Sequence, residues 1–194
     1  MDLKRGRPRT FDRATALEEA TRLFWSRGYD AVSIADLTSA LGISAPSLYA
    51  AFSNKRALFF EAVQHYQDAY GISLAPDLPA RDAVDRLMRD AAAAYTDPGR
   101  PPGCLVVSGA VNTNAESAEV AAALARRRKG LQSAIVRRLR RGLRDGELPA
   151  GTDAVGLAAF YTATIQGMSQ RARDGASRHE LQAIAAAAMH AWPA

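Results

Sequence analysis

The stretch Gly42–Lys55, GISAPSLYAAFSNK, carries side chains whose types and spacing suit the binding of an anionic partner. Ser44 follows an apolar-periodic segment and can cap a new helix with its hydroxyl. Lys55 then places a cation in the first turn of the following helix, where it opposes the helix dipole. Because a local rule broken without evident structural gain often marks function, we interpret Lys55 as a phosphate clamp. A random surface position for this lysine is the alternative.

The segment Lys4–Arg9, KRGRPR, is a second candidate for contact with a polyanion. It resembles the core of an AT-hook, in which glycine and proline keep the backbone narrow and extended. Such a backbone allows Arg5 and Arg7, with Arg9 beside them, to enter an A·T minor groove. A basic tail that contacts phosphates without sequence preference explains the same residues equally well.

The 194-residue chain has a globular composition, with 48% hydrophobic and 23% charged residues. Its formal net charge of +5 and its sequence pI of about 9.7 favour a polyanionic partner, although a solvated basic surface gives the same sum. A single cysteine, Cys104, excludes a disulfide framework and a multi-cysteine zinc site, and it fits a reducing compartment. The first ten residues lack the apolar core of a signal peptide, and no segment approaches the apolar length that spans a bilayer. We therefore expect a cytoplasmic protein with no membrane partner.

Nearly every segment has the apolar spacing of an α-helix, and none alternates convincingly as a strand does. This pattern predicts an all-α fold of about nine helices, with a domain boundary near the helix-breaking segment 75–79. The expected N-caps of the first four helices are Asp12, Ser33, Ser44 and Ser53, and the expected ends of the first two are Gly28 and Gly42. The fourth helix runs to about residue 70, and later helices are expected at about 81–95, 104–111, 117–144, 153–173 and 177–192.

Three short helices within the first 55 residues, the second and third joined at Gly42, form the arrangement of a helix-turn-helix. Leu48 and Phe52 are spaced to anchor the third helix on the apolar face of the second. The remaining residues of the third helix are left to face outward: Ala45, Pro46, Ser47, Tyr49 and Ala50. Small side chains there let the backbone approach a major groove closely, so the pattern predicts DNA binding. An ordinary three-helix core fragment is the alternative.

The segment 15–63, TALEEATRLFWSRGYDAVSIADLTSALGISAPSLYAAFSNKRALFFEAV, strongly resembles the amino-terminal domain of TetR/AcrR-type transcriptional regulators. The resemblance covers roughly a quarter of the chain and implies that Ser33, Ser44 and Tyr49 give hydroxyl groups to DNA phosphates. Half-buried packing is the alternative for Tyr49. The full set of residues expected to contact DNA is Arg5, Arg7, Arg9, Ser33, Ser44, Ala45, Pro46, Ser47, Tyr49 and Lys55.

Together with the break at 75–79, the resemblance divides the chain into a basic arm over 1–10, a helix-turn-helix domain over 11–57 and a carboxy-terminal effector-binding and dimerisation domain over 75–194. A fourth helix at about 54–71 links them. Ala50 and Ala51 stand where many relatives carry a histidine or an aromatic residue, and the third helix has no arginine, asparagine or glutamine for bidentate pairing with a base. Base choice is therefore expected from thymine methyl contacts and from DNA shape.

The expected helix 153–173 is apolar nearly all round, so it must be covered on more than one side. One face carries small residues that allow a second helix to approach closely. We expect this face and part of the last helix to form a two-fold dimer interface with Gly156, Ala159, Phe160, Ala163, Gly167, Ile184 and Ala188. As the resemblance implies, such a homodimer would present two recognition helices to palindromic double-stranded operator DNA. Burial inside a monomer is the alternative.

In regulators of this family a cavity among the carboxy-terminal helices takes a small-molecule effector, and the resemblance implies the same here. The candidate lining residues are Met88, Tyr95, Cys104, Phe160, Tyr161 and Met168. Their apolar character favours a hydrophobic or aromatic effector, although each would also fit an ordinary core. Cys104 stands at an expected helix start, where a thiolate is favoured, so a redox or electrophile sensor is a second hypothesis. A small buried residue that begins a packed helix is the plainer interpretation of this cysteine.

The arginine run between Arg126 and Arg141 has the highest charge density in the chain. Leu124, Leu131 and Leu139 recur at helical spacing around and within it, so the arginines lie on the other faces. We interpret them as a solvated basic surface, with a second DNA-contact surface as the alternative.

Catalytic chemistry has no support in the sequence. His65, His179 and His190 are scattered, and Ser108 lacks the glycine-flanked pattern of a nucleophile. We find neither a phosphate-cradling glycine loop nor paired metal ligands, so we expect no enzyme, no cofactor and no metal. The sequence thus predicts a DNA-binding transcriptional regulator, most simply a dimeric repressor that a small hydrophobic or aromatic effector releases from its operator. A DNA-binding protein without an effector and a Cys104-based sensor are the alternatives.

Overall fold

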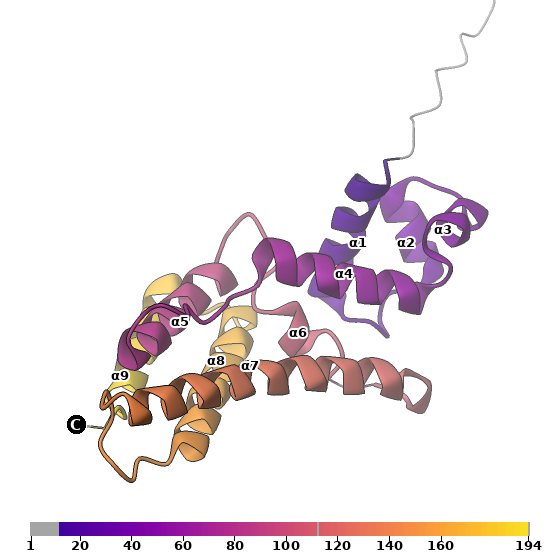
Figure 1. Cartoon of the computed structure of the whole chain (residues 1–194). Helices are drawn as coiled ribbons and strands as arrows, with labels where there is room; N and C mark the ends of the chain where they lie inside the picture. The colour runs from indigo at the N-terminus through magenta and orange to yellow at the C-terminus, as the bar shows by residue number, and fades with distance from the viewer. Residues whose placement is uncertain (1–11, 112, 194) are drawn as a thin grey trace, which may run out of the picture.

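The computed structural model describes residues 12–111 and 113–193, and within these ranges every regular element is helical (Figure 1). The elements are α1 (Arg13–Arg27), α2 (Ile34–Leu41), α3 (Ala45–Phe52), α4 (Lys55–Tyr70), α5 (Ala80–Tyr95), α6 (Leu105–Ser108), a 3₁₀ turn (Ala115–Ser117), α7 (Ala118–Arg144), α8 (Ala154–Arg173) and α9 (Arg178–Met189). The prediction of an all-α fold with about nine helices is therefore confirmed. No helix in these ranges combines the length and the apolarity needed to cross a membrane.

Short-range hydrogen bonds fix the ends of the first helices. Asp12 caps α1, and Ser33 forms a reciprocal capping box with Asp36 at the start of α2. Gly42 ends α2 in the left-handed conformation, with φ 64° and ψ 33°, and Ser44 caps α3. These caps and this glycine lie where the sequence predicts them.

The start of α4 differs from the prediction. Asn54, and not Ser53, is the N-cap, and its side-chain oxygen accepts from the Ala57 amide at 2.8 Å. Ser53 instead ends α3: its amide donates to the Tyr49 carbonyl at 2.8 Å, and its φ of 63° turns the chain out of the helix. Because Ser53 is used to end one helix, the cap of the next helix falls to the following residue.

Two later helices are shorter than predicted. α6 is about one turn long and does not reach Val111, because the chain turns at Gly109 toward the first helices, and the Gly109 carbonyl accepts from the Tyr29 amide at 2.8 Å. α9 ends early, at Met189, close to Pro193, which disfavours the helical conformation of the residue before it.

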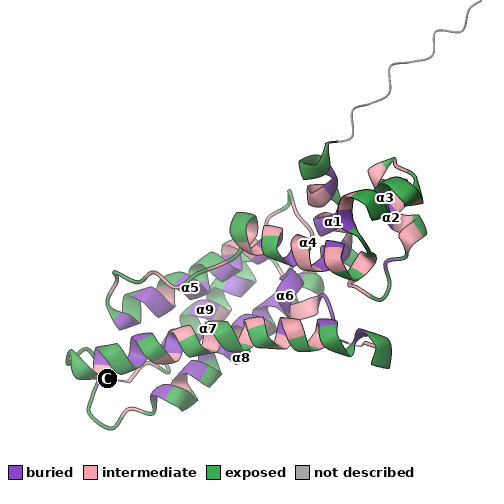
Figure 2. Cartoon of the chain, turned by 45° about the vertical axis from the view of Figure 1, so that its right-hand side comes forward, coloured by how far each residue is buried: buried purple, intermediate pink, exposed green. Residues whose placement is uncertain are grey.

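The helices gather at two ends that α4 connects (Figure 1). We call α1–α4 the head and α5–α9 the body. In the head, α1 makes extensive contact with α4; in the body, α5 packs on α9 and α7 packs on α8. Figure 2 shows buried residues on the sides of helices that face one another, whereas α3 keeps one exposed face. The head therefore carries an outward surface, and the body encloses a core.

Candidate nucleic-acid interface and ligand cavity

The expected DNA contacts that the structure describes all lie in the head. Arg5, Arg7 and Arg9 lie outside the described residues. The others stand at the start of α2, along α3 and at the start of α4: Ser33, Ser44, Ala45, Pro46, Ser47, Tyr49 and Lys55.

α3 has a buried face and an exposed face. Leu48 and Phe52 are almost completely buried against the rest of the head. On the opposite face Pro46 and Ser47 are exposed, and Tyr49 keeps 46% of its surface accessible. A helix held by two apolar anchors can present these side chains rigidly, although it is too short to be stable alone.

The start of α3 carries two neighbouring hydroxyl groups. Ser44 Oγ accepts from the Ser47 amide at 3.3 Å, and the two hydroxyl oxygens lie 2.9 Å apart. Both serines are exposed, while Ala45 between them is half-buried. Hydroxyl groups and amides at a helix N-terminus suit a phosphate oxygen. This geometry is compatible with the predicted contact, which stays a prediction.

Arg13 holds the far end of α3 in place. Its guanidinium lies 4.5 Å from the centroid of the Phe52 ring, and its Nε donates to the Ala51 carbonyl at 3.3 Å. The same side chain pairs with Glu61 of α4, with Nη2 and Oε2 2.6 Å apart. The sequence interpretation missed Arg13, because Ala51 and Glu61 lie 38 and 48 residues further along the chain.

Ser33 has its donors already engaged. Its amide and its hydroxyl both donate to the Asp36 carboxylate, and the hydroxyl accepts from the Asp36 amide. The hydroxyl first, and then the amide, lower the pKa of Asp36, so an ionised carboxylate stands beside Ser33. The predicted capping role of Ser33 is confirmed, but its predicted phosphate contact has no donor left in this conformation.

Lys55 occupies the first turn of α4, as predicted, and has a partner that the sequence interpretation missed. Its Nζ lies 4.4 Å from the centroid of the Tyr29 ring. Burial lowers the pKa of Lys55, while Asp30 and Asp36 oppose this shift. The cation–π contact offsets part of the unfavourable helix position, so the assumption that Lys55 brings no structural gain is wrong. Its phosphate contact stays a prediction.

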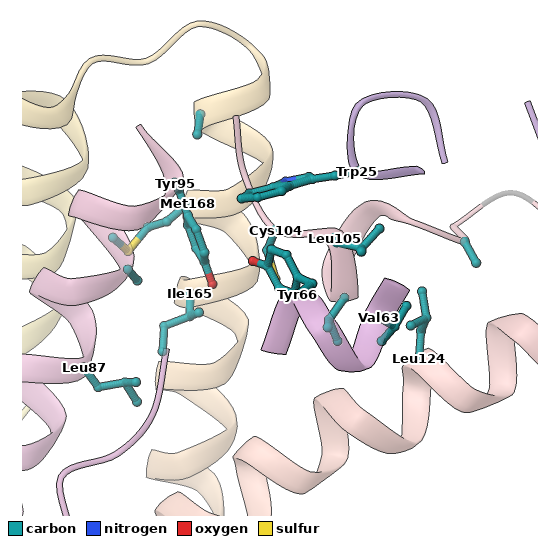
Figure 3. Close-up of a cluster of buried hydrophobic side chains, with 14 of the residues drawn as sticks. Trp25, Val63, Tyr66, Leu87, Tyr95, Cys104, Leu105, Leu124, Ile165 and Met168 are labelled. Atoms are coloured by element: carbon teal, nitrogen blue, oxygen red, sulfur yellow. The ribbon is translucent and has the colours of Figure 1, made fainter. Parts of the chain in front are cut away.

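A cavity of about 80 Å³ lies where the end of α4 meets the body. Its lining residues are Tyr66, Gln67, Gly71, Ile72, Tyr95, Cys104, Val106, Val107, Arg127, Arg128, Leu131, Thr162, Ile165 and Gln166. Figure 3 shows four of them close together: Tyr66, Tyr95, Cys104 and Ile165. The structure thus brings together side chains from five helices or their ends, α4 to α8.

Two of the six predicted lining residues, Tyr95 and Cys104, border this cavity. Met88, Tyr161 and Met168 are buried but are not among the residues that line this cavity, and Phe160 is 43% exposed. These four residues do not border this cavity, because helical spacing identifies an apolar face but not the part of it that borders empty space, and their contact with an effector stays a prediction.

Cys104 lies on the cavity wall beside two phenol groups. Figure 3 shows the hydroxyl ends of Tyr66 and Tyr95 close to it. Burial first, and then the nearby Cys104, raise the pKa of both phenols, so both hydroxyls stay protonated at neutral pH. The Cys104 amide donates to Ser169 Oγ at 2.9 Å, which fixes the start of α6. Because α6 has only four residues, its dipole gives the thiol little of the support that the sequence interpretation assumed.

The cavity also has a polar wall that the sequence interpretation missed. Arg127 and Arg128 of α7 line it, together with glutamines of α4 and α8. These arginines follow the buried Leu124 at spacings of three and four, which places them at the edge of the buried face. That signal was present in the sequence, but the density of charge favoured a fully solvated surface.

α8 carries an exposed face of small and apolar residues. The exposed residues include Gly156, Ala159, Phe160, Ala163 and Gly167, as predicted for an interface, and also Val155. On α9, Ile184 is half-buried, and Ala188 is buried within its own chain. Ala188 therefore does not contribute to this exposed face.

The backbone that leads into and out of α6 contacts the head at α1 and at the turn after it. Trp25 Nε1 donates to the Gly103 carbonyl at 3.2 Å, one residue before the cavity-lining cysteine. After α6, the Gly109 carbonyl accepts from the Tyr29 amide at 2.8 Å. One short segment of backbone thus joins the cavity wall to the turn that precedes α2.

Two family models match the chain. Residues 16–62 match "Bacterial regulatory proteins, tetR family", and residues 80–188 match "Tetracyclin repressor-like, C-terminal domain". The two matched segments fall in the head and in the body, and together they cover more than half of the chain.

Characterised relatives and solved structures resemble the chain over nearly its whole length. The HTH-type transcriptional repressor ComR of Escherichia coli (strain K12) is 37% identical over 198 residues, which cover 97% of this chain and 92% of ComR. The HTH-type transcriptional repressor BdcR of the same organism is 32% identical over 188 residues, which cover 94% of this chain and 90% of BdcR. A cysteine-substituted form of the TetR family transcriptional regulator CifR, solved with a 26 bp double-strand operator DNA, has a TM-score of 0.91 and 43% identity, covering 97% of this chain and 100% of that one.

Proposed function

Because the chain belongs to the TetR family of bacterial regulatory proteins, we propose that it is a DNA-binding transcriptional repressor and not an enzyme. It acts as a homodimer on double-stranded operator DNA and is released by a small effector that enters the cavity. The main observation behind this proposal is the exposed face of α3. Leu48 and Phe52 anchor one side of this short helix, and no other described residue covers the opposite side. The repressors ComR and BdcR, and the CifR complex with operator DNA, support it.

In this proposal α3 enters the major groove and its flanks hold the DNA backbone. Ser44 and Tyr49 donate their hydroxyl hydrogens to phosphates, and Lys55 neutralises a further phosphate from the start of α4. Ala45 and Pro46 let α3 approach the bases closely and contact thymine methyl groups. The basic arm before α1 adds contacts in the minor groove.

The exposed face of α8 supports the homodimer. Its small residues let α8 of a second copy approach closely, while Val155 and Phe160 add apolar area. The two heads then meet the two halves of a palindrome.

A charged substitution in the exposed face of α8 tests the dimer. Gly167→Arg is expected to give particles near 20.8 kDa, the mass of one chain, whereas the unchanged protein gives about twice that mass in light scattering. Ser133→Arg, on the exposed side of α7, is the matched control and should remain dimeric. If the protein without substitutions has the mass of a single chain, the proposed dimer is wrong.

Selection of bound genomic fragments tests the proposed function as a whole. The unchanged protein is expected to retain a small set of fragments that share an inverted repeat. Metabolites of the pathways encoded beside those fragments are then tested for release of the protein. If none of a broad set of metabolites releases the protein from these fragments, a DNA-binding protein without an effector is favoured. Failure to enrich any fragment would contradict the proposal.

A second candidate is a repressor that responds to oxidants or electrophiles through Cys104. The position of this thiol on the cavity wall, beside Tyr66 and Tyr95, favours it. Cys104→Ser keeps the size of the side chain and removes the thiol. Oxidants should then release the unchanged protein from its operator but not the variant. Equal release of both proteins would rule out this candidate.

A further inference from the structure

The polar wall of the cavity contains two arginines without an acidic partner. Arg127 and Arg128 are half-buried on α7, and the ion pairs among the described residues include neither of them. Arg128 Nη1 donates to the Val106 carbonyl at 2.8 Å, and Arg127 approaches the amide oxygen of Gln64 at 3.4 Å. Both guanidinium groups keep further donors and their positive charge at the cavity. A carboxylate is the ligand that such planar donors fit well.

Another part of the wall contains an acceptor without a donor. Gln67 Oε1 of α4 is buried and has no hydrogen-bond partner among the described residues. A buried carbonyl without a donor is unfavourable, so a ligand that donates to this oxygen gains affinity. Hydroxyl and amide N–H groups are the donors that small organic acids commonly carry.

The rest of the wall is largely apolar, and the space is small. Tyr66, Ile72, Leu131 and Ile165 supply hydrocarbon or ring surface. The volume of about 80 Å³ is close to half of the roughly 150 Å³ of an engineered cavity that accepts benzene. The enclosed space therefore favours a short aliphatic chain over a bulkier hydrophobic group.

We propose that the effector is a short-chain organic acid that carries a hydroxyl or amide N–H group on its chain. This inference rests on the proposed function, because it names the class of molecule that the same cavity accepts. The carboxylate pairs with Arg127 and Arg128, the second group donates to Gln67 Oε1, and the chain packs on Tyr66 and Ile165. The ligand then touches α4, which belongs to the head, and lies beside α6, whose flanking backbone contacts Trp25 and Tyr29 of the head.

Four probes of similar size separate these requirements: 3-hydroxybutyrate, butyrate, butyramide and butylamine. Calorimetric titration of the full chain should give the highest affinity with 3-hydroxybutyrate. The affinity for butyrate should exceed that for butyramide by at least about tenfold, and butylamine should not bind. Equal affinities for butyrate and butyramide, or no binding of either acid, would overturn the proposal.

Charge-matched variants locate the binding site. Arg127→Gln removes one guanidinium from the cavity wall, and Arg126→Gln makes the same charge change at the exposed neighbouring position. The first should lower the affinity for both acids by at least about tenfold, and the second should leave it unchanged. Arg128→Lys is a second variant that keeps the charge but loses the planar donors, and it should also weaken acid binding. Equal losses in Arg127→Gln and Arg126→Gln would indicate a general charge effect and refute the site.

Operator binding in the same preparations separates the two proposals. Selective operator binding without binding of either acid leaves repression in place and refutes the organic-acid effector. Binding of the acids without preference for any duplex supports the ligand class and refutes the repressor.

Discussion

The head and the body use buried residues in opposite ways. In the head, Leu48 and Phe52 are buried so that the other face of α3 can stay exposed. In the body, residues such as Tyr95 and Ile165 are almost fully buried and also line the cavity. A surface site can therefore lose a contact without losing stability, whereas most changes at the cavity also change the packing around it.

The largest expected effect comes from removing an anchor of α3. Leu48→Ala truncates a fully buried side chain and should lower the free energy of unfolding by about 3 kcal/mol, through lost burial and the space left behind. Operator binding should be lost with it, because the exposed face is no longer held. Urea unfolding and operator titration measure the two effects. A variant with native stability and native operator affinity would show that the buried anchor is not needed to hold the exposed face of α3.

An ion pair between a buried and an exposed residue of the body should affect stability but not DNA binding. Glu147 pairs with the buried Arg138, with 2.7 Å between Oε2 and Nη2, and also accepts from the Ala80 amide. Glu147→Ala leaves the guanidinium without its counter-charge, which should cost about 2 kcal/mol of unfolding free energy, less than for a fully buried pair because Glu147 is exposed. Operator affinity, measured where the variant is folded, should match that of the unchanged protein. A loss of affinity without a loss of stability would contradict this separation of head and body.

The same ion pair predicts a dependence of stability on pH. The hydrogen bond from Arg138, and then that from the Ala80 amide, lower the pKa of Glu147 in the folded protein. A lowered folded-state pKa means that the pair contributes fully above the ordinary glutamate pKa of about 4.3 and less as the pH falls through the folded value. Between the ordinary value and the lowered folded value, the unfolding free energy should fall more steeply with falling pH for the unchanged protein than for Glu147→Ala. Parallel curves would show that the ion pair does not cause the dependence.

A smaller effect, confined to DNA binding, is expected at the exposed face of α3. Tyr49→Phe removes only a hydroxyl, and loss of one hydrogen bond to a phosphate should lower operator affinity by about tenfold. The free energy of unfolding should change by less than about 0.5 kcal/mol, since the ring stays in place. Fluorescence anisotropy with a selected operator measures the first quantity. An unchanged affinity would exclude a phosphate contact from this hydroxyl.

The matching change in the body should have the smallest effect. The Tyr161 hydroxyl is buried without a hydrogen-bond partner among the described residues, and burial raises its pKa to about 12. Tyr161→Phe should therefore leave the unfolding free energy unchanged or raise it by up to about 1 kcal/mol, with operator affinity unaffected. Thermal unfolding at fixed protein concentration measures the change. A clear destabilisation would mean that this hydroxyl has a partner in the assembled protein.

Much of the head could be predicted because its signals are local. Ser33 and Ser44 cap helices through bonds to residues three positions ahead, and Gly42 needs only its own φ to end α2. The error at the start of α4 arose where two residues suited to capping, Ser53 and Asn54, stand together. Only the positive φ of Ser53 decides between them, and the sequence does not reveal it.

The cavity could not be predicted in the same way. Its walls come from α4 to α8, and each residue along a helix turns the side chain direction by about 100°. A small rotation of α8 therefore decides that Ile165 borders the space while Tyr161 and Met168 do not. Arg128 was misjudged for the same reason, since it stands in a run of charged residues and its cavity contacts come from other helices.

Competition between a selected duplex and heparin tests most directly whether α3 reads DNA in a dimer. The full chain is bound at low ionic strength to a fragment with an inverted repeat, and excess heparin is added. We predict that two chains stay bound to each duplex while non-selected fragments are displaced. Displacement from every duplex alike would show that the head binds only as a polycation, and the repressor proposal would then be wrong.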